Sequence, residues 1–275
     1  MTINGVFALS HWGKEFTSFR MTMPSTSTSA PLLARAVDLT AGYGERTVLE
    51  GVSLDIHHGE ILVILGGSGC GKTTLLKSFI GLLPPAQGRI ELFGQEWWAL
   101  DEPEREASLR RIGVLFQNGA LLGSKTLATN VAVPLEMHTN LPEEVIERVV
   151  RLKLHQVGLE DAADRLPSEL SGGMRKRAGL ARALALDPEL LFCDEPSAGL
   201  DPPTAYNLDQ LLKSLRDGLG LTIVVVTHEI ASIMRIADRI AFLDGGKLIF
   251  SGTVKEALDG GVEPVVKFFE MDGRK

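Results

Sequence analysis

The chain has 275 residues, and its 28 basic and 35 acidic side chains give a formal net charge of −7. This balance argues against a protein that binds nucleic acid through a basic surface. The purest apolar stretches, Ile61–Leu65 and Ile223–Val226, are much shorter than the roughly 20 residues that a membrane-spanning helix needs. The two cysteines, Cys70 and Cys193, lie far apart, and the N-terminus has no apolar signal-peptide core. The sequence therefore predicts a soluble, intracellular protein without a disulfide framework.

The first 31 residues differ in composition from the rest of the chain. The run Pro24–Ser29 is polar and of low complexity, which is unfavourable for a packed element. We expect residues 1–31 to be a disordered extension, with Met1, Met21 or Met23 as the true start of the protein. A functional tail is the alternative.

From Leu32 onward the pattern is strand-like. Val48–Ile56 has the alternation of paired outer strands. Three short apolar runs are typical of strands buried on both faces: Ile61–Leu65, Leu190–Cys193 and Thr222–Val226. Because helical segments alternate with these runs, the sequence predicts an α/β fold with a parallel sheet covered by helices.

Helical patterns occupy two parts of the chain. One helix is expected over Lys72–Leu83, directly before a Pro-Pro pair. Residues of about 118–187 are predicted to form a helical insertion in the α/β core. Within it, one helix is expected over Pro142–Val157, ended by Gly158, and a second from Ser171 through Leu184 to Pro188.

A glycine-rich loop follows the first buried strand and matches the pattern G-x-x-x-x-G-K-[ST]. Its glycines let backbone N–H groups turn toward phosphate oxygens, and the helix N-terminus that follows favours an anion. The Lys72 ammonium is expected to reach the β- and γ-phosphates, the Thr73 hydroxyl to ligate Mg²⁺, and the Thr74 hydroxyl to contact the α-phosphate. The sequence predicts a nucleotide site made of Gly66, Gly67, Ser68, Gly69, Cys70, Gly71, Lys72, Thr73 and Thr74.

Two carboxylates follow the apolar run that begins at Leu190. Asp194 is placed to hold Mg²⁺, directly or through water, and Glu195 to act as a general base toward the attacking water. The separation of Asp194 from Lys72 is far longer than one crossover between parallel strands requires. The predicted helical insertion accounts for this extra chain.

A second glycine motif, Leu170–Met174, reads LSGGM and comes shortly before the acidic strand. Tyr43, Gln117, Asp201 and His228 complete an ordered set with the phosphate loop. Over about residues 32–252 this set resembles the ATP-binding cassette (ABC) family, in which Gln stands at the position of Met174. The resemblance implies a P-loop NTPase core, a parallel sheet flanked by helices, with an antiparallel β subdomain and a helical subdomain. Residues 253–275 are then expected to be a short C-terminal tail.

The resemblance also implies roles for single residues. Tyr43 is expected to stack on adenine, and Asp201 belongs to the segment that the family calls the D-loop. Gln117 is expected to link Mg²⁺ and the lytic water to the surface where a membrane subunit docks, and His228 to hold the γ-phosphate. Since Glu195 and His228 are both present, we expect an active ATPase that converts ATP and water to ADP and phosphate.

The signature motif has a physical role of its own. Ser171, Gly172 and Gly173 begin a helix and so form a second anion-binding N-terminus. One chain cannot easily close two such loops on one γ-phosphate, and in the family two cassettes pair head to tail, each signature (here Ser171 to Met174) covering the partner's ATP. We expect such a homodimer. The adjoining basic run Arg175–Arg177 is interpreted as a solvated helix face.

The LSGGM signature and the sequence around Gln117 resemble the ATPases of Mla/MCE-type phospholipid transport systems. This resemblance implies an MlaE-type membrane permease, an MCE-domain protein and, in some systems, a small STAS-domain subunit. It places the cassette on the cytoplasmic face of the inner membrane. The alternatives are an ABC importer or exporter for another substrate, and a soluble ABC protein acting on DNA or ribosomes, for which no second cassette, long coiled coil or zinc module is visible.

Overall fold

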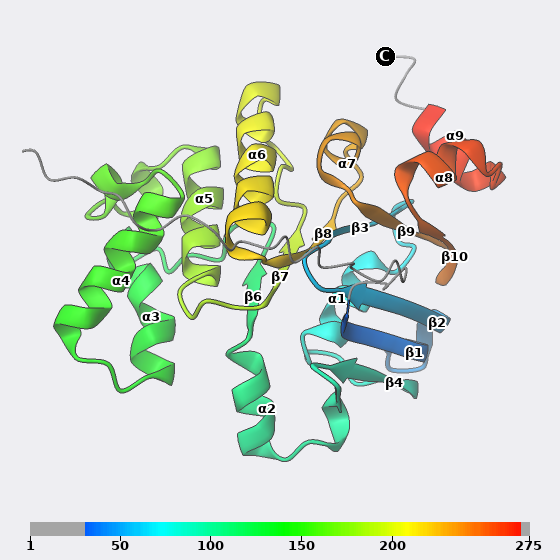
Figure 1. Ribbon diagram of the computed structural model, residues 1–275, viewed down its shortest axis with the longest axis horizontal. Helices are drawn as coiled ribbons and strands as arrows, with labels where there is room; N and C mark the ends of the chain where they lie inside the picture. The colour runs from blue at the N-terminus through cyan, green and yellow to red at the C-terminus, as the bar shows by residue number, and fades with distance from the viewer. Residues whose placement is uncertain (1–30, 271–275) are drawn as a thin grey trace, which may run out of the picture.

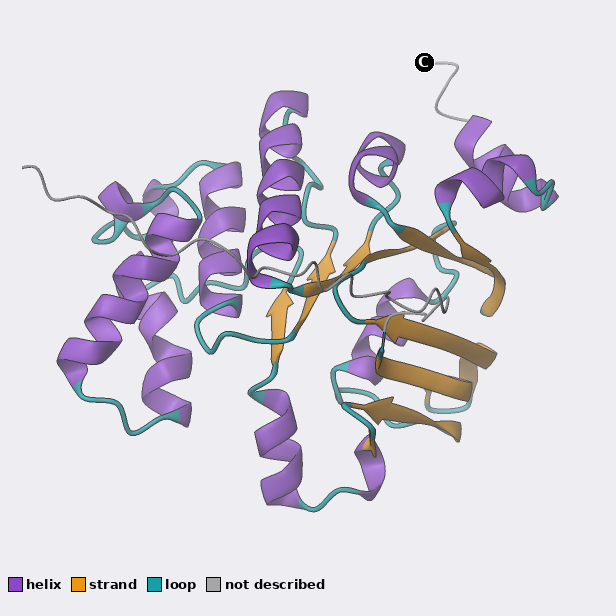
Figure 2. Cartoon of the chain, viewed as in Figure 1, coloured by secondary structure: helices purple, strands orange, loops and turns teal. Residues whose placement is uncertain are grey.

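The computed structural model describes residues 31–270 of the chain. It contains two β-sheets with helices packed around them (Figures 1 and 2). The extension predicted over residues 1–31 lies outside the described residues, apart from Pro31. Within residues 31–270, none of the helices has the length and apolar composition that crossing a membrane would require.

The larger sheet has six strands in the order β10-β9-β3-β8-β7-β6. Neighbouring strands from β9 to β6 pair in parallel, and β10 pairs antiparallel with β9 at one edge. The three predicted buried strands are confirmed as β3, β7 and β8. The bounds are Ile61–Gly66 for β3, Ile112–Leu115 for β6, Leu190–Asp194 for β7, Thr222–Val226 for β8, Arg239–Asp244 for β9 and Lys247–Gly252 for β10.

The smaller sheet is antiparallel, with the order β2-β1-β4-β5. It confirms the predicted outer strands and adds two short ones that follow α1. A 3₁₀ turn, Trp97–Ala99, follows β5. The bounds are Leu32–Tyr43 for β1, Arg46–His57 for β2, Gln87–Leu92 for β4 and Gln95–Glu96 for β5.

Helices cover both faces of the larger sheet. Figure 1 shows α3, α4 and α5 gathered at one end of the molecule and the antiparallel sheet at the other end. The helices that surround the sheets are α1 (Lys72–Phe79), α2 (Glu102–Leu109), α3 (Leu127–His138), α4 (Glu143–Gln156), α5 (Gly172–Ala183), α6 (Pro202–Leu219) and α7 (Ile230–Ile236).

Both helices expected in the middle of the chain are present, as α4 and α5. Gly158 lies just beyond α4 with a φ of 66°, a left-handed conformation that favours glycine. Ser171 caps α5, because its hydroxyl oxygen accepts a hydrogen bond from the backbone N–H of Met174 at 3.2 Å.

The helix after the phosphate loop is shorter than the sequence predicts. It ends at Phe79 rather than near Leu83. Gly81 adopts a φ of 75°, and a Cβ at this position would lie 2.6 Å from the Trp97 ring. A left-handed glycine is a common helix end, so Gly81 ends the helix before the prolines that follow, and the absence of a side chain there leaves room for Trp97.

The residues after β10 form two helices, α8 (Val254–Asp259) and α9 (Glu263–Glu270). Ala257 and Val265 are fully buried. The ring of Phe268 meets that of Phe242 of β9 edge to face, with centroids 5.4 Å apart. The described part of this segment therefore packs on the larger sheet, where the sequence suggested only a short tail.

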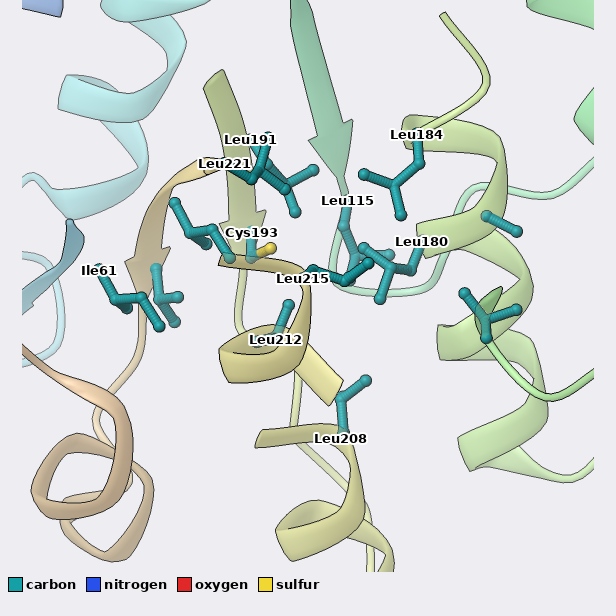
Figure 3. Close-up of a cluster of buried hydrophobic side chains, with 14 of the residues drawn as sticks. Ile61, Leu115, Leu180, Leu184, Leu191, Cys193, Leu208, Leu212, Leu215 and Leu221 are labelled. Carbon is teal, nitrogen blue, oxygen red and sulfur yellow. The ribbon is translucent and has the colours of Figure 1, made fainter. Parts of the chain in front are cut away.

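Alternate residues of the buried strands belong to opposite cores. Ile61, Val63 and Leu65 of β3 join the cluster that includes side chains of α3 to α6, part of which is drawn in Figure 3. Leu62 and Ile64 join the cluster shared with α1 and the antiparallel sheet. The period of two in a strand makes each of these short runs apolar throughout.

Phe192 provides a test of this packing. It is fully buried in β7, and its ring stacks on Phe79 of α1 with centroids 5.9 Å apart. We expect Phe192→Ala to lower the free energy of unfolding by about 3–5 kcal/mol, because the substitution leaves a cavity. Phe116→Ala is the matched control, since Phe116 is 37% exposed. Urea denaturation measures both variants, and equal losses would contradict the described core.

Candidate functional site

Four loops meet at one edge of the larger sheet, because each follows the carboxyl end of one of four neighbouring parallel strands. Ile64 of β3 pairs with Val226 of β8, and Val226 pairs with Asp194 of β7. Cys193 of β7 pairs with Leu115 of β6. The phosphate loop, the His228 segment, the acidic pair and the Gln117 segment therefore begin side by side. Ligands of open α/β sheets bind at this edge.

The phosphate loop is shaped by glycines. Gly66, Gly69 and Gly71 have φ values of 146°, 77° and 106°. A Cβ at Gly66 would lie 2.1 Å from the carbonyl oxygen of Leu243. The end of β3 therefore could not lie this close to β9 if Gly66 had a side chain. Gly71 is the N-cap of α1 and supplies no side-chain acceptor, which leaves the first N–H groups of this helix available to an anion.

The Lys72 ammonium lies inside this loop. Its Nζ donates to the carbonyl oxygens of Gly66 at 2.8 Å and Gly67 at 3.0 Å. The Cys70 sulfur lies 3.9 Å from the same nitrogen, but its side chain is buried against the core. Cys70 therefore contributes backbone to the loop, while Lys72 holds the positive charge.

The acidic pair is joined to His228. Nδ1 of His228 donates to Oε1 of Glu195 at 2.8 Å. Oε2 of Glu195 is buried and has no hydrogen-bond partner among residues 31–270. The structure thus brings Glu195 and His228 together.

Asp194 is the carboxylate of the site whose pKa is raised. Burial raises the pKa of its carboxyl group, and the nearby negative charge of Glu195 adds to this shift. Three ammonium groups oppose the shift, those of Lys176, Lys77 and Lys72. A cation near Asp194 would relieve both the burial of the carboxylate and its repulsion by Glu195.

Tyr43 and Gln117 flank the site and are both exposed. Tyr43 ends β1 beside α1, where Nζ of Lys77 lies 3.3 Å from its hydroxyl oxygen and 5.4 Å from the ring centroid. The sequence analysis did not identify Lys77, because a lysine in a helix carries no signal of its own. Gln117 lies two residues beyond β6, at the same edge as Glu195.

The signature residues do not join this edge. They open α5, which packs against β6, and β6 is three strands away from β3, or about 14 Å by strand spacing. A Cβ at Gly173 would lie 2.4 Å from Cγ2 of Thr204, so this glycine allows α5 to approach α6 closely. Met174 is partly buried and packs against the core, which suits an apolar side chain where the family has Gln.

Asp201 caps α6. Its carboxylate accepts hydrogen bonds from the Thr204 hydroxyl at 2.7 Å and from the Thr204 backbone N–H at 3.1 Å. These bonds lower the pKa of Asp201. The nucleotide contact predicted for Asp201 stays a prediction. In this structure its carboxylate binds Thr204 of its own chain.

The interpretation of Arg175–Arg177 as a solvated face is wrong for its central residue. Lys176 is only 6% exposed, and its Nζ donates to the Glu195 carbonyl oxygen at 2.8 Å. Lys176 shares a helix face with Gly173 and Leu180, both of which are buried. Their spacing of three and four residues is the signal that could have identified this lysine.

The charge balance predicts how Asp194 affects stability. A raised native pKa means that ionisation is less favourable in the folded protein, so Asp194 destabilises the nucleotide-free fold at neutral pH. We expect Asp194→Asn to raise the midpoint of thermal unfolding at pH 7. The gain should shrink as the pH falls toward the ordinary pKa of an aspartate, where the wild-type group is also neutral.

Differential scanning calorimetry without nucleotide or Mg²⁺ measures this effect. Glu147→Gln on the exposed part of α4 is the control for loss of one negative charge. A fall in the midpoint for Asp194→Asn, or an equal rise in the control, would contradict the electrostatic description.

The chain is similar in sequence to known proteins. The model of the ABC transporter family matches residues 49–198. The chain is 42% identical over 243 residues to the intermembrane phospholipid transport system ATP-binding protein MlaF of Haemophilus influenzae, a match that covers 88% of this chain and 92% of the relative. It is 43% identical over 241 residues to the methionine import ATP-binding protein MetN of Brucella abortus, covering 88% of this chain and 65% of that protein.

A solved structure shows the same fold. The ATP-binding cassette MJ0796, determined as a dimer in a post-hydrolysis state bound to ADP and Pi, superposes with a TM-score of 0.74 and 32% sequence identity. The match covers 81% of this chain and 99% of that one. These matches confirm the predicted cassette fold. With the phosphate loop and the acidic pair at one sheet edge, they show that the chain belongs to the ABC transporter family and is an ATPase of that family.

Proposed function

We propose that the phosphate loop binds MgATP, with Lys72 neutralising the β- and γ-phosphates. The observation that carries this proposal is the convergence of the loop, the acidic pair and His228 at adjacent strand ends. The residues present suit Mg²⁺, because a Thr73 hydroxyl, an Asp194 carboxylate and a Gln117 carbonyl are oxygen ligands and Asp194 is destabilised without a cation. When bound, the ion would offset the charge that develops on the transferred phosphoryl group.

Glu195 is the proposed general base. Its Oε1 accepts from His228, and its side chain keeps a 15% exposure through which the carboxylate would accept the proton of the attacking water. The positive φ of Glu195, 47°, turns the chain sharply directly after β7. His228 is 63% exposed at its side chain, so it can turn toward a γ-phosphate while remaining next to Glu195.

Two copies of the chain are proposed to complete each ATP site. Ser171, Gly172 and Gly173 form a helix N-terminus suited to an anion, yet they lie three strands away from the phosphate loop of their own chain. A second chain in the opposite orientation would place its signature over this loop. Tyr43 of the chain that supplies the loop would stack on adenine, and the Asp201 segment would lie at the interface between the two chains.

The proposed cargo is phospholipid, moved through an MlaE-type permease with an MCE-domain protein and, in some systems, a small STAS-domain subunit. Identity alone does not separate the relatives, since MlaF is 42% and MetN 43% identical to this chain. The LSGGM signature at Leu170–Met174, which resembles that of the Mla/MCE-type ATPases, supports the lipid system. The cassette would then act on the cytoplasmic face of the inner membrane and maintain outer-membrane lipid asymmetry.

The proposed role of Glu195 as general base can be tested by kinetics. We expect Glu195→Gln to lower kcat for ATP hydrolysis by about 10²–10⁴-fold, because an amide cannot accept the proton of water. Nucleotide affinity, measured by equilibrium binding of ATP, should remain near that of the wild type. Glu189→Gln, at the opposite end of β7, is the matched control, since the Glu189 carboxylate forms a half-exposed ion pair with Arg111 away from the site. Unchanged kcat in Glu195→Gln would contradict this role.

The cargo is tested by co-purification and transfer. The tagged chain is expressed with its neighbouring genes, and the purified complex is analysed for protein partners and lipid by mass spectrometry. The proposal predicts an MlaE-type permease, an MCE-domain protein, and ATP-dependent transfer of fluorescent phosphatidylethanolamine between vesicles. The Lys72→Ala complex is the control and should retain its partners without transfer. A soluble solute-binding protein with an unrelated permease would replace the lipid proposal by an importer.

A further inference from the structure

The helix that carries the signature is fastened to the core by its basic side chains. Arg182 near its end donates to the carbonyl oxygens of Ala120 at 2.7 Å and Gly119 at 3.0 Å, in the segment after Gln117. Lys176, one turn from its start, donates to the carbonyl oxygen of Glu195. A single rigid helix, α5, therefore touches two of the loops that surround the nucleotide site.

Lys176 is an unusual residue for such a contact. Burial lowers the pKa of its ammonium group, and the charges of Glu195, Asp194 and Glu229 act in the opposite direction. A buried ammonium group destabilises a fold unless its partners compensate for lost hydration. The hydrogen bond to the Glu195 carbonyl oxygen, at 2.8 Å, is the close partner that the structure shows.

Glu195 is held by four hydrogen bonds. Its backbone N–H donates to the carbonyl oxygen of Val226 at 2.8 Å, and its side chain accepts from His228. Its backbone carbonyl oxygen accepts from Nζ of Lys176 at 2.8 Å and from the backbone N–H of Ala198 at 3.3 Å. With a φ of 47°, its backbone is in a conformation that non-glycine residues rarely adopt without support. The support comes from β8 on one side and from α5 on the other.

We propose that Lys176 is a positioning residue for Glu195, through which the signature helix sets the orientation of the general base in its own chain. The proposal rests on the roles proposed above for Glu195 and for the signature. Because Ser171 opens the same helix only five residues before Lys176, any displacement of α5 by the partner's nucleotide would be carried to the Glu195 carbonyl. Each cassette would then adjust its own base according to whether the facing site is filled.

A direct role in phosphate binding does not fit this geometry. Lys176 is 6% exposed, and its Nζ is turned toward the Glu195 backbone. Arg175 and Arg177, the neighbours of Lys176, instead donate to the carbonyl oxygens of Leu170 at 2.7 Å and Val157 at 3.1 Å. Lys176 is the member of this basic run that reaches the catalytic strand.

Steady-state kinetics of the full chain test the proposal. We expect Lys176→Met to lower kcat by about 10- to 100-fold with little change in KM for ATP, since the base is displaced while the phosphate loop is intact. Lys176→Arg should recover part of the loss, because a guanidinium can donate to the same carbonyl. Arg177→Met is the matched control on the same helix and should retain a kcat near that of the wild type.

Thermal unfolding separates positioning from a purely structural role. Lys176→Met removes a buried charge but also one of the ammonium groups that offset the charge of Asp194, so its unfolding midpoint should shift only so far that the chain stays fully folded at the assay temperature while kcat falls. In the Glu195→Gln background the same substitution should cause no further loss of kcat, because the group that Lys176 positions is already absent.

Equal fold-losses in the two backgrounds, or a Lys176→Met chain that is already unfolding at the assay temperature, would overturn the role of Lys176. A wild-type kcat in Glu195→Gln alone would instead overturn the role of Glu195, and the two failures are therefore distinguishable.

Discussion

The site depends on the parallel alignment of four neighbouring strands, β3, β8, β7 and β6. Their registers bring the phosphate loop, His228, the acidic pair and Gln117 to the same edge, although these segments are far apart in sequence. Hydrogen bonds between buried strands fix this alignment, and side chains of opposite cores hold both faces. Loops that carry chemistry can then vary in conformation while their starting points stay fixed.

The same edge concentrates groups that oppose folding. Asp194 and Glu195 are adjacent carboxylates, Lys176 is a buried ammonium, and Glu195 has a left-handed backbone. All three residues lie at the proposed nucleotide site and not among the apolar side chains of either core. The apolar strands below the edge supply the stability that lets this arrangement persist.

Sequence patterns predicted the parts of the site that are local in the chain. The phosphate loop and the acidic pair each follow a short apolar run that is recognisable as a buried strand, so the sequence alone predicts their positions at the strand ends. The end of α1 at Phe79 also has a local signal, the left-handed Gly81 two residues later. The burial of Lys176 instead depends on its contact with Glu195, which is distant in sequence. The C-terminal helices were missed for the same reason, because Val265 and Phe268 are buried only against a sheet that other segments build.

The central claim is that one ATP site is built from two chains, and mixing of two inactive variants tests it most directly. Lys72→Ala disables the phosphate loop, and Ser171→Arg disables the signature. In a mixed dimer, one site combines an intact loop with an intact signature, so ATPase activity should rise above the sum of the separate variants, to about a quarter of wild type for equal mixing of independent sites. Activity no greater than that sum would contradict a site shared between two chains.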